Sequence, residues 1–373
     1  MNFSAADRAA MRQALRLAER GLYSATPNPR VGCVLTKDGA VIGEGWHHRA
    51  GEPHAEIRAL SAAGGKAQGA TAYVTLEPCS HHGRTPPCAD ALIAAGVRRV
   101  VAAMEDPNPQ VSGRGLTGLR AAGVTVETGL LEEAARELNI GFIARMTRGR
   151  PWLRLKIAAS LDGRTALHNG ESQWITGTAA RQDGHHWRAR ACAILTGMGT
   201  VRADDPRLDA RGVKTDRQPV KVILDPRLQL SPKARLFASG APVLVVSAVE
   251  DHASAAPLRD VGAECLCLPD ANGRIDLRAL MREMAARGMN EAHGEAGAKL
   301  NGALIAAGLA DELLFYLAPC LLGDAARPLA ALPELTALDE RVRCVFHDIQ
   351  PMGCDLRLLA RFMGRENGEI QAR

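Results

Sequence analysis

Aromatic residues make up only 3% of the 373-residue sequence, and no dense run of lysine or arginine occurs in it. Proteins that bind single-stranded nucleic acid stack bases on aromatic side chains within a basic groove, and the sequence shows neither feature. The net charge of +5 is a mild excess for this length. We therefore expect a small-molecule ligand and no nucleic-acid partner.

The sequence also has no apolar stretch near the roughly 20 residues that a transmembrane helix needs. The residues from Met1 to Arg8 lack the apolar core of a secretory signal. Nine cysteines without regular spacing do not form a disulfide framework. We expect a cytoplasmic protein with reduced thiols and no membrane partner.

The length of the chain indicates two domains, because 373 residues exceed one ordinary core. We place the boundary in the arginine- and proline-containing segment 147–151, which gives domains 1–147 and 148–373. Strand and helix patterns alternate in the first domain, which predicts an α/β sandwich. Helices are predicted at 4–20, from 54, 86–96, 116–122 and 131–143, and strands at 31–36, 40–45, 71–76, 98–103 and 124–127.

The second domain begins a new alternating series of strands and helices. Its last strands follow one another without a helix between them, which predicts a mixed sheet. Strands are predicted at 152–159, 191–196, 220–224, 242–247, 290–294, 312–318, 342–348 and 354–360, and helices at 178–189, 276–287 and 298–307.

Three residues in the first domain are of the types and in the order of a zinc site, namely His54, Cys79 and Cys88. Imidazole nitrogen and thiolate suit Zn²⁺, and three protein ligands leave the fourth tetrahedral position open for water. Zinc lowers the pKa of a bound water to near neutrality, and Glu56 is placed to carry protons. The order His-x-Glu, Pro-Cys, Cys is that of zinc deaminases that act on nucleobases.

The spacing of the two cysteines departs from the usual Cys-x-x-Cys, because eight residues separate them. A purely structural zinc site would require a fourth protein ligand, and His81 and His82 are candidates for it. We interpret them as pocket-lining residues, because the site needs polar groups to hold a substrate. Glu56 argues separately against a structural site, which has no use for a carboxylate there. A deaminase of tRNA adenosine or free nucleosides, with an inert second domain, and a chain with one active half remain alternatives.

The segment Thr75-Leu-Glu-Pro-Cys-Ser-His-His-Gly-Arg-Thr-Pro-Pro-Cys88 resembles the bifunctional deaminase–reductases of riboflavin biosynthesis. Pro27-Asn-Pro-Arg-Val-Gly32, Lys156-Ile-Ala-Ala-Ser-Leu-Asp-Gly-Arg-Thr165 and Gly170-Glu-Ser-Gln-Trp-Ile-Thr176 fit that family too. The resemblance covers nearly the whole chain, about residues 5 to 360. It implies a cytidine-deaminase-like α/β/α domain, a dihydrofolate-reductase-like α/β domain, and the cofactors Zn²⁺ and NADPH.

The family's substrate is a diaminopyrimidinone that carries a ribosylamino phosphate. In the deaminase domain the resemblance implies that Asn28 and His47 position the ring or ribose. Because the substrate is an anion, we expect His82 and Arg84, between the cysteines, to serve its phosphate. The product of the second domain would be a ribitylamino-uracil phosphate.

A glycine-rich run in the second domain, Gly294 to Ala303, follows a predicted strand and opens a helix. The run alone fits an anion site and a plain glycine-rich turn about equally. The resemblance favours a site for the NADPH pyrophosphate at Gly297, Ala298, Lys299, Leu300, Asn301, Gly302 and Ala303. It implies further cofactor contacts from Ala158, Trp174, Thr200 and Asp204. It implies substrate contacts from Ser172, Arg188, Leu208, Arg211 and Glu295, with Lys156 as a further candidate.

A second glycine run, Gly113-Arg-Gly-Leu-Thr-Gly118, spells the dinucleotide fingerprint G-x-G-x-x-G. The fingerprint must follow a strand directly, whereas here a loop with Pro107 and Pro109 intervenes. We interpret these glycines as residues that mark the ends of a helix. We also expect His185 and His186 to be solvated residues of one helix, and the chain to form a homo-oligomer.

Overall fold

The chain divides into two compact units, Met1–Arg150 and Pro151–Arg373. The computed structural model describes residues 3–80, 87–109 and 111–363. His82 and Arg84, expected to serve a phosphate, and His81 lie outside the described residues. Within those residues, no helix is both long and apolar enough to cross a membrane.

A five-stranded sheet forms the centre of the first unit, in the order β2-β1-β3-β4-β5. The predicted hairpin is present, with Asp38 and Gly39 both at positive φ in its turn. Strand β3 pairs antiparallel with β1 and parallel with β4, which pairs parallel with β5. The strands are β1 (Gly32–Lys37), β2 (Ala40–Trp46), β3 (Thr71–Val74), β4 (Arg99–Ala102) and β5 (Thr125–Thr128).

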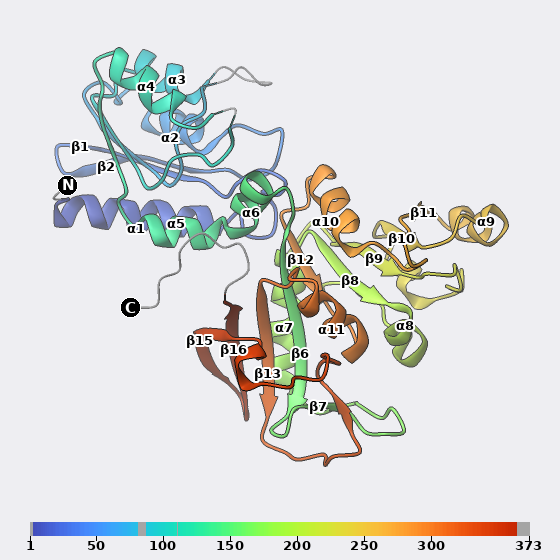
Figure 1. Cartoon of the computed structure of the whole chain (residues 1–373). Helices are drawn as coiled ribbons and strands as arrows, with labels where there is room; N and C mark the ends of the chain where they lie inside the picture. Colours follow the sequence, from blue (N-terminus) through green and yellow to red (C-terminus); the bar gives the residue numbers. More distant parts are fainter. Residues whose placement is uncertain (1–2, 81–86, 110, 364–373) are drawn as a thin grey trace. The chain divides into compact units, whose positions relative to one another are not determined.

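Helices cover both faces of this sheet, because successive strand residues point to opposite sides. Cys33 and Leu35 of β1 pack in one core cluster, and Val34 packs in another. The first cluster joins the sheet to α2 (Ala55–Ala63), α3 (Cys88–Ala94) and α4 (Arg114–Ala121). The second joins it to α1 (Ala5–Glu19) and α5 (Glu132–Leu138). Figure 1 shows these two groups of helices on opposite sides of the strands.

Two glycines of β2 allow helix α2 to lie close against the sheet. A Cβ atom on Gly43 would lie 2.3 Å from the Ala59 carbonyl oxygen, and one on Gly45 would lie 2.3 Å from that of Ala55. Only glycine permits this approach. The contact fixes the start of α2, where His54 is the N-cap residue rather than part of the first turn as predicted.

The single helix predicted at 131–143 is wrong, because two helices occupy this region. Helix α5 ends at Leu138, and α6 (Ile140–Arg148) begins after Asn139. The Asn139 side chain accepts a hydrogen bond from the Arg30 N–H at 2.8 Å and donates one to the Arg30 carbonyl at 2.9 Å. This tertiary contact overrides the helical pattern and anchors α6 beside the loop that precedes β1.

The second unit contains a nine-stranded sheet in the order β11-β10-β9-β8-β12-β6-β13-β16-β15. The strands from β11 to β13 are parallel, and β16 and β15 are antiparallel, so the predicted mixed sheet is confirmed. The strands are β6 (Trp152–Ser160), β8 (Ala193–Gly197), β9 (Val220–Leu224), β10 (Val243–Ser247), β11 (Ala263–Cys267), β12 (Glu291–Gly294), β13 (Glu312–Ala318), β15 (Cys344–Met352) and β16 (Asp355–Phe362). A small separate sheet pairs β7 (Arg164–Ala166) with β14 (Arg327–Pro328).

Helices pack against this sheet in three core clusters. Helices α10 (Leu277–Ala286) and α11 (Ala298–Ala306) share one cluster, and α8 (Met198–Asp204) and α9 (His252–Asp260) share another. Helix α7 (Thr178–Arg190) packs on β13 and β16 in the third. The sequence did not predict α8, α9 or β11. Helix α9 carries Pro257 in its interior, a residue that argues against a helix unless the tertiary structure supports it.

A buried cluster of polar groups holds α1 on its sheet. The Asp7 carboxylate accepts hydrogen bonds from the Tyr73 hydroxyl at 2.7 Å and from the Arg99 guanidinium at 2.6 Å, and it forms the predicted capping box with Ser4. Burial favours a higher pKa, but the hydrogen bonds from Arg99, Tyr73 and Ser4 prevail and hold the pKa of Asp7 well below its ordinary value. The ionised carboxylate therefore stabilises the fold.

The substitution Asp7→Asn is expected to lower the unfolding free energy of the first unit at neutral pH by about 1–3 kcal/mol. Because the folded pKa is depressed, this stability is present above the unfolded pKa of about 3.9 and is lost as pH falls through the folded pKa. The difference between wild type and variant should therefore shrink below about pH 4. Calorimetry across this range measures it, with Arg136→Ala at the exposed Arg136–Glu132 pair as control. A difference independent of pH would contradict the assignment.

Candidate functional site

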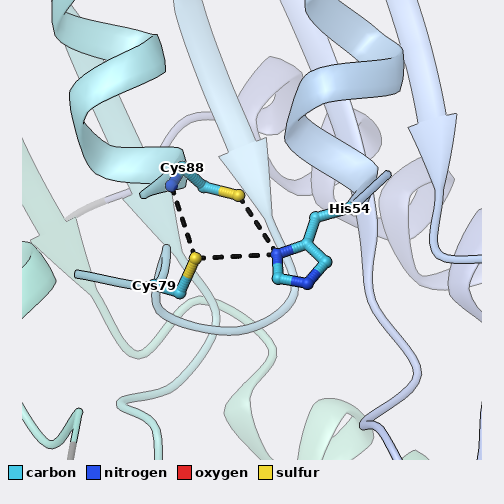
Figure 2. Close-up of side chains that lie close together, drawn as sticks. All are labelled: His54, Cys79 and Cys88. Carbon is cyan, nitrogen blue, oxygen red and sulfur yellow. Dashed lines mark hydrogen bonds between the residues drawn. The ribbon is translucent and has the colours of Figure 1, made fainter. Parts of the chain in front are cut away.

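The structure brings His54, Cys79 and Cys88 together from three separate segments. His54 caps α2, Cys88 is the first residue of α3, and Cys79 lies in the loop that follows β3. The ligand atoms of the three residues all lie within 4.8 Å of one another. His54 Nδ1 lies 3.3 Å from Cys88 Sγ and 3.6 Å from Cys79 Sγ, as Figure 2 shows.

These distances fit a tetrahedral zinc ion. With Zn–N and Zn–S distances of about 2.0 and 2.3 Å, a tetrahedron separates its nitrogen and sulfur ligands by about 3.5 Å. The Cys88 backbone N–H also donates to Cys79 Sγ at 3.3 Å, which keeps the two cysteines close together. The described residues thus supply one nitrogen and two sulfur ligands, the set typical of a catalytic site with an open position.

Hydrogen bonding from Cys88, chiefly from its thiol, lowers the pKa of Cys79 to about 4. Cys79 is therefore a thiolate at neutral pH, which is the form that binds a metal. Glu56 lies in the first turn of α2 and is only 3% exposed. Burial first, and then the neighbouring Cys79 thiolate, raise the pKa of Glu56 to about 7. A carboxyl group with such a pKa can both accept and donate a proton near neutral pH.

A cavity of about 460 Å³ opens onto this group of residues. Its lining includes Asn28, His47, His54, Glu56 and Cys79, so these five predicted residues of the first domain meet in one place. The Asn28 amide lies 3.0 Å from His47 Nε2, and His47 Nδ1 lies 3.4 Å from the Pro53 carbonyl oxygen. Burial lowers the pKa of His47 to about 4, so the ring is neutral. One neutral tautomer satisfies both contacts, with Nδ1 as donor and Nε2 as acceptor.

The sequence did not single out several other residues that line this cavity. Leu76 and Glu77 belong to the zinc-motif segment itself, and the others come from the loop after β4 and from α6, far from that motif in the chain. Their identities give no signal without the fold, since each occurs in an ordinary loop or helix pattern. They are Leu76, Glu77, Asp106, Asn108, Val111, Phe142, Arg145 and Met146.

Glu77 joins the zinc loop to the segment before α4. Its carboxylate accepts four backbone N–H groups, from Asp106 at 3.1 Å, Gly113 at 2.9 Å, Gly115 at 2.8 Å and Leu116 at 3.3 Å. The last three are at the start of α4, within the G-x-G-x-x-G run. A protein carboxylate thus occupies the helix N-terminus that a dinucleotide phosphate occupies in a Rossmann fold.

In the second unit, a charged cluster lies at the carboxyl end of β12 and beside the middle of its parallel neighbour β6. The carboxyl ends of parallel strands are the usual place for ligand sites in such sheets. Arg188 on α7 binds Glu295, just after β12, through two hydrogen bonds of 2.5 and 2.7 Å. Burial opposes ionisation of Glu295, but Arg188 and then His293 keep its pKa well below the ordinary value. Burial lowers the pKa of Lys156 on β6, which also interacts with the Glu295 and Arg188 charges.

Three further residues expected to contact the substrate belong to the same unit. Leu208 is buried at a positive φ, and Ser172 is half-buried. The Arg211 N–H donates to His185 Nδ1 at 3.2 Å. The prediction that His185 is a solvated residue is therefore wrong, because this half-buried ring is an acceptor for the 205–219 loop.

Several residues expected to contact the cofactor lie on helices that follow the strands of this sheet. Thr200 and Asp204 belong to α8, which follows β8, and Gly297 is the N-cap of α11, which follows β12. Ala158 lies on β6, and Trp174 is 69% exposed with the Arg181 guanidinium stacked 4.5 Å from its ring centre.

Within the glycine-rich run, two residues pack against a different segment. The Asn301 side chain donates to the Ala296 and Leu329 carbonyl oxygens. A Cβ on Gly302 would lie 2.0 Å from the Ala331 carbonyl oxygen, so glycine allows that close approach. Gly297, Ala298, Lys299 and Leu300 form the start of the helix, with Ala303 one turn further on.

Each of the two units matches a known protein family. Residues 4–104 match the family described as the cytidine and deoxycytidylate deaminase zinc-binding region, and residues 151–358 match the RibD C-terminal domain. The riboflavin biosynthesis protein RibD of Escherichia coli strain K12 is 49% identical over 360 residues, which is 93% of this chain and 97% of that protein. The RibD protein of Haemophilus influenzae is 48% identical over 96% of this chain and 98% of that protein.

Solved structures show the same similarity over both units. Acinetobacter baumannii RibD, form 1, has a TM-score of 0.90 at 44% identity and covers 96% of this chain and 99% of that one. A diaminohydroxyphosphoribosylaminopyrimidine deaminase/5-amino-6-(5-phosphoribosylamino)uracil reductase from Thermotoga maritima has a TM-score of 0.85 at 34% identity, with 96% and 99% coverage.

A zinc-binding deaminase domain followed by a reductase domain defines a bifunctional deaminase–reductase. The fold class predicted for each domain is confirmed. The chain belongs to the RibD family of riboflavin biosynthesis proteins, which confirms the resemblance seen in its sequence. Its cofactors are Zn²⁺ and NADPH.

The contact between α4 and the zinc loop gives a sharp prediction. A Cβ on Gly115 would lie 2.0 Å from the Pro78 carbonyl oxygen, next to the ligand Cys79. We expect Gly115→Ala to displace that loop, to weaken zinc retention and to lower deaminase activity by about 10-fold or more, since a 1 Å displacement can cost about 100-fold. Gly118→Ala on the same helix is the control, because its Cβ meets nothing within 4 Å.

The control variant should keep its zinc and its rate of ammonia release, and alanine should make the helix slightly more stable. Zinc content after dialysis and ammonia release are measured for both variants. If the two variants retain zinc and activity equally, the Glu77-anchored contact does not support the metal site.

Proposed function

We propose that residues 1–147 catalyse the hydrolytic deamination of 2,5-diamino-6-ribosylamino-4(3H)-pyrimidinone 5′-phosphate. Residues 148–373 then reduce the ribosyl group to ribityl with NADPH, which gives 5-amino-6-(5-phosphoribitylamino)uracil. The observation that carries the proposal is the cluster of His54, Cys79 and Cys88, of which His54 and Cys79 line one cavity together with Glu56. That cavity has the size of a small-molecule site.

In the deamination, His54, Cys79 and Cys88 would hold zinc, which lowers the pKa of a bound water and so supplies the nucleophile. Glu56 accepts a proton from the water and delivers it to the departing amino nitrogen. Ammonia leaves, and a ring carbonyl replaces the amino group. The neutral His47 ring and the Asn28 amide, hydrogen-bonded to each other, position the pyrimidine or its ribose.

In the reduction, hydride from the nicotinamide reaches C1′ of the ribose, and the ring oxygen gains a proton as the sugar opens. Lys156, in the middle of β6, and Glu295, just after β12, are the groups placed to move protons in this cluster. The lowered pKa of Lys156 makes it a better proton donor than an ordinary lysine. Ser172, Arg188, Leu208 and Arg211 would bind the substrate beside them.

The cofactor would lie at the starts of α8 and α11. A Cβ on Gly197, the N-cap of α8, would lie 3.3 Å from a methyl carbon of Leu300 in the first turn of α11. The two helix N-termini are therefore neighbours, and N-terminal amides attract phosphate. We assign the pyrophosphate to Gly297, Ala298, Lys299, Leu300, Asn301, Gly302 and Ala303, and the rest of the cofactor to Ala158, Trp174, Thr200 and Asp204.

The proposal is tested with the full chain and the diaminopyrimidinone phosphate. Without NADPH, ammonia should be released and the reaction should stop at the deaminated ribosyl compound. Addition of NADPH should then cause its oxidation in a one-to-one ratio with the ammonia released. Oxidation of NADPH without any release of ammonia would contradict the proposed order of the two steps.

We also propose that the chain is a homo-oligomer in the cytoplasm. Strand β15 is the edge of the large sheet and exposes Phe346 (64%) and Ile349 (54%). Their partners on β16, Ala360 and Leu358, are two residues apart, so both side chains lie on one face, which a second copy would cover. None of the nine cysteines, all of which are among the described residues, forms a disulfide, which suits a reducing compartment. Light scattering on the purified protein measures the oligomeric state.

A further inference from the structure

The deaminase cavity has an unequal distribution of charge. Its described lining contains three acidic residues, Glu56, Glu77 and Asp106, and one arginine, Arg145. Four backbone N–H groups surround the Glu77 carboxylate, and Asp106 accepts the Asn108 N–H at 2.8 Å. The substrate nevertheless carries a phosphate of about −2 charge at neutral pH. A phosphate in an acidic cavity needs cations nearby. His82 and Arg84, predicted from the sequence to serve it, lie outside the described residues, and Arg145 is the arginine that the described lining adds to them.

Helix α6 places Arg145 at the edge of this cavity. Phe142 and Met146, one turn apart on the same helix, line the cavity with it. The Arg145 guanidinium donates from Nη2 to the Pro27 carbonyl oxygen at 3.1 Å and lies 5.8 Å from the centre of the Phe142 ring. The guanidinium is therefore beside the Pro27–Asn28 loop, whose Asn28 amide contacts His47.

The position of α6 is itself fixed by the fold. Asn139, at the break between α5 and α6, binds both backbone groups of Arg30. Arg30 follows the Pro27–Asn28 loop by two residues, so the loop and α6 are held together at two points, Arg30–Asn139 and Pro27–Arg145. The arginine is thus held in place before a ligand binds, which reduces the entropy lost on binding.

We propose that Arg145 recognises the 5′-phosphate of the deaminase substrate. The inference rests on the proposed deaminase reaction and adds a residue that determines specificity for the phosphorylated substrate. A guanidinium has five N–H donors in a fixed plane, so it can bind a carbonyl oxygen and phosphate oxygens together. Two of the zinc ligands, His54 and Cys79, line the same cavity as Arg145, so the pyrimidine ring would lie at the metal while the phosphate lies at α6.

The experiment compares two substrates, the diaminopyrimidinone ribosylamine with and without its 5′-phosphate. For Arg145→Gln we expect the KM for the phosphorylated substrate to rise about 10- to 100-fold, the range of a hydrogen bond to a charged group, with kcat little changed. The KM for the substrate without phosphate should stay the same. Arg145→Lys should recover part of the loss, because it restores the charge but not the planar fork.

A matched control is Arg136→Gln on the preceding helix α5, where Arg136 forms an exposed pair with Glu132. It should change neither KM. If Arg145→Gln raises the KM for both substrates equally, the arginine only supports the Pro27–Asn28 loop and the proposal is overturned. No change with either substrate overturns it as well. Failure of the wild type to release ammonia is a separate result, which contradicts the proposed deaminase function itself.

Discussion

Ammonia release is expected to fall by about 100- to 10,000-fold when Glu56 is replaced by glutamine, the range for loss of a general acid–base group. Glutamine has nearly the same shape, so it fits the buried position in the first turn of α2, but it cannot carry a proton. The zinc ligands His54, Cys79 and Cys88 are unchanged. Zinc content should therefore stay the same while kcat for deamination falls.

Two controls make this result specific. The same Glu56→Gln protein should oxidise NADPH at the wild-type rate when it receives the deaminated substrate, because that reaction belongs to the other unit. Glu52→Gln changes a nearby but partly exposed carboxylate, which is paired with Arg58 at 2.7 Å. It should retain ammonia release. Full deaminase activity in Glu56→Gln would show that Glu56 is not the proton carrier.

The complementary result is expected for Lys156→Met, which should lose about 100- to 10,000-fold in NADPH oxidation. Methionine keeps an unbranched apolar chain on β6 but removes the ammonium group beside Arg188 and Glu295. Deamination by the same protein should be unchanged. The assay is single-turnover NADPH oxidation with the deaminated substrate.

Lys221→Met is the matched control for a buried lysine in the same sheet. Lys221 lies on β9, its ammonium group donates to Leu236 and Ser239, and burial lowers its pKa to about 8. Its loss should reduce the stability of the second unit without changing the reductase kcat of the folded protein. If Lys156→Met and Lys221→Met change kcat alike, Lys156 has no special part in the reduction.

The zinc motif could be predicted from the sequence because the metal requires particular residue types, and His54, Glu56, Cys79 and Cys88 lie within 35 residues of one another. The strands of both sheets except β11 could be predicted from apolar periodicity, which depends on neighbours in the chain. Both kinds of signal are local. The family resemblance added the substrate and the cofactor, which periodicity alone does not provide.

The remaining features depend on contacts between distant parts of the chain. Asn139 breaks a helix because it binds Arg30, which lies 109 residues earlier. Arg145 looks like an ordinary basic residue near a helix end until its contact with Pro27 places it at the cavity. Glu77 precedes the zinc-motif proline, but its partners are amides 29 to 39 residues later. No residue type marks these roles, since any helix or loop can carry them.

Zinc stoichiometry, measured with both activities on one preparation, tests the central claim most directly. The protein should contain one zinc per chain, and its removal by a chelator should abolish ammonia release while NADPH oxidation with the deaminated substrate continues. Added zinc should restore ammonia release. A zinc-free protein that still deaminates the pyrimidine at the full rate would contradict the account.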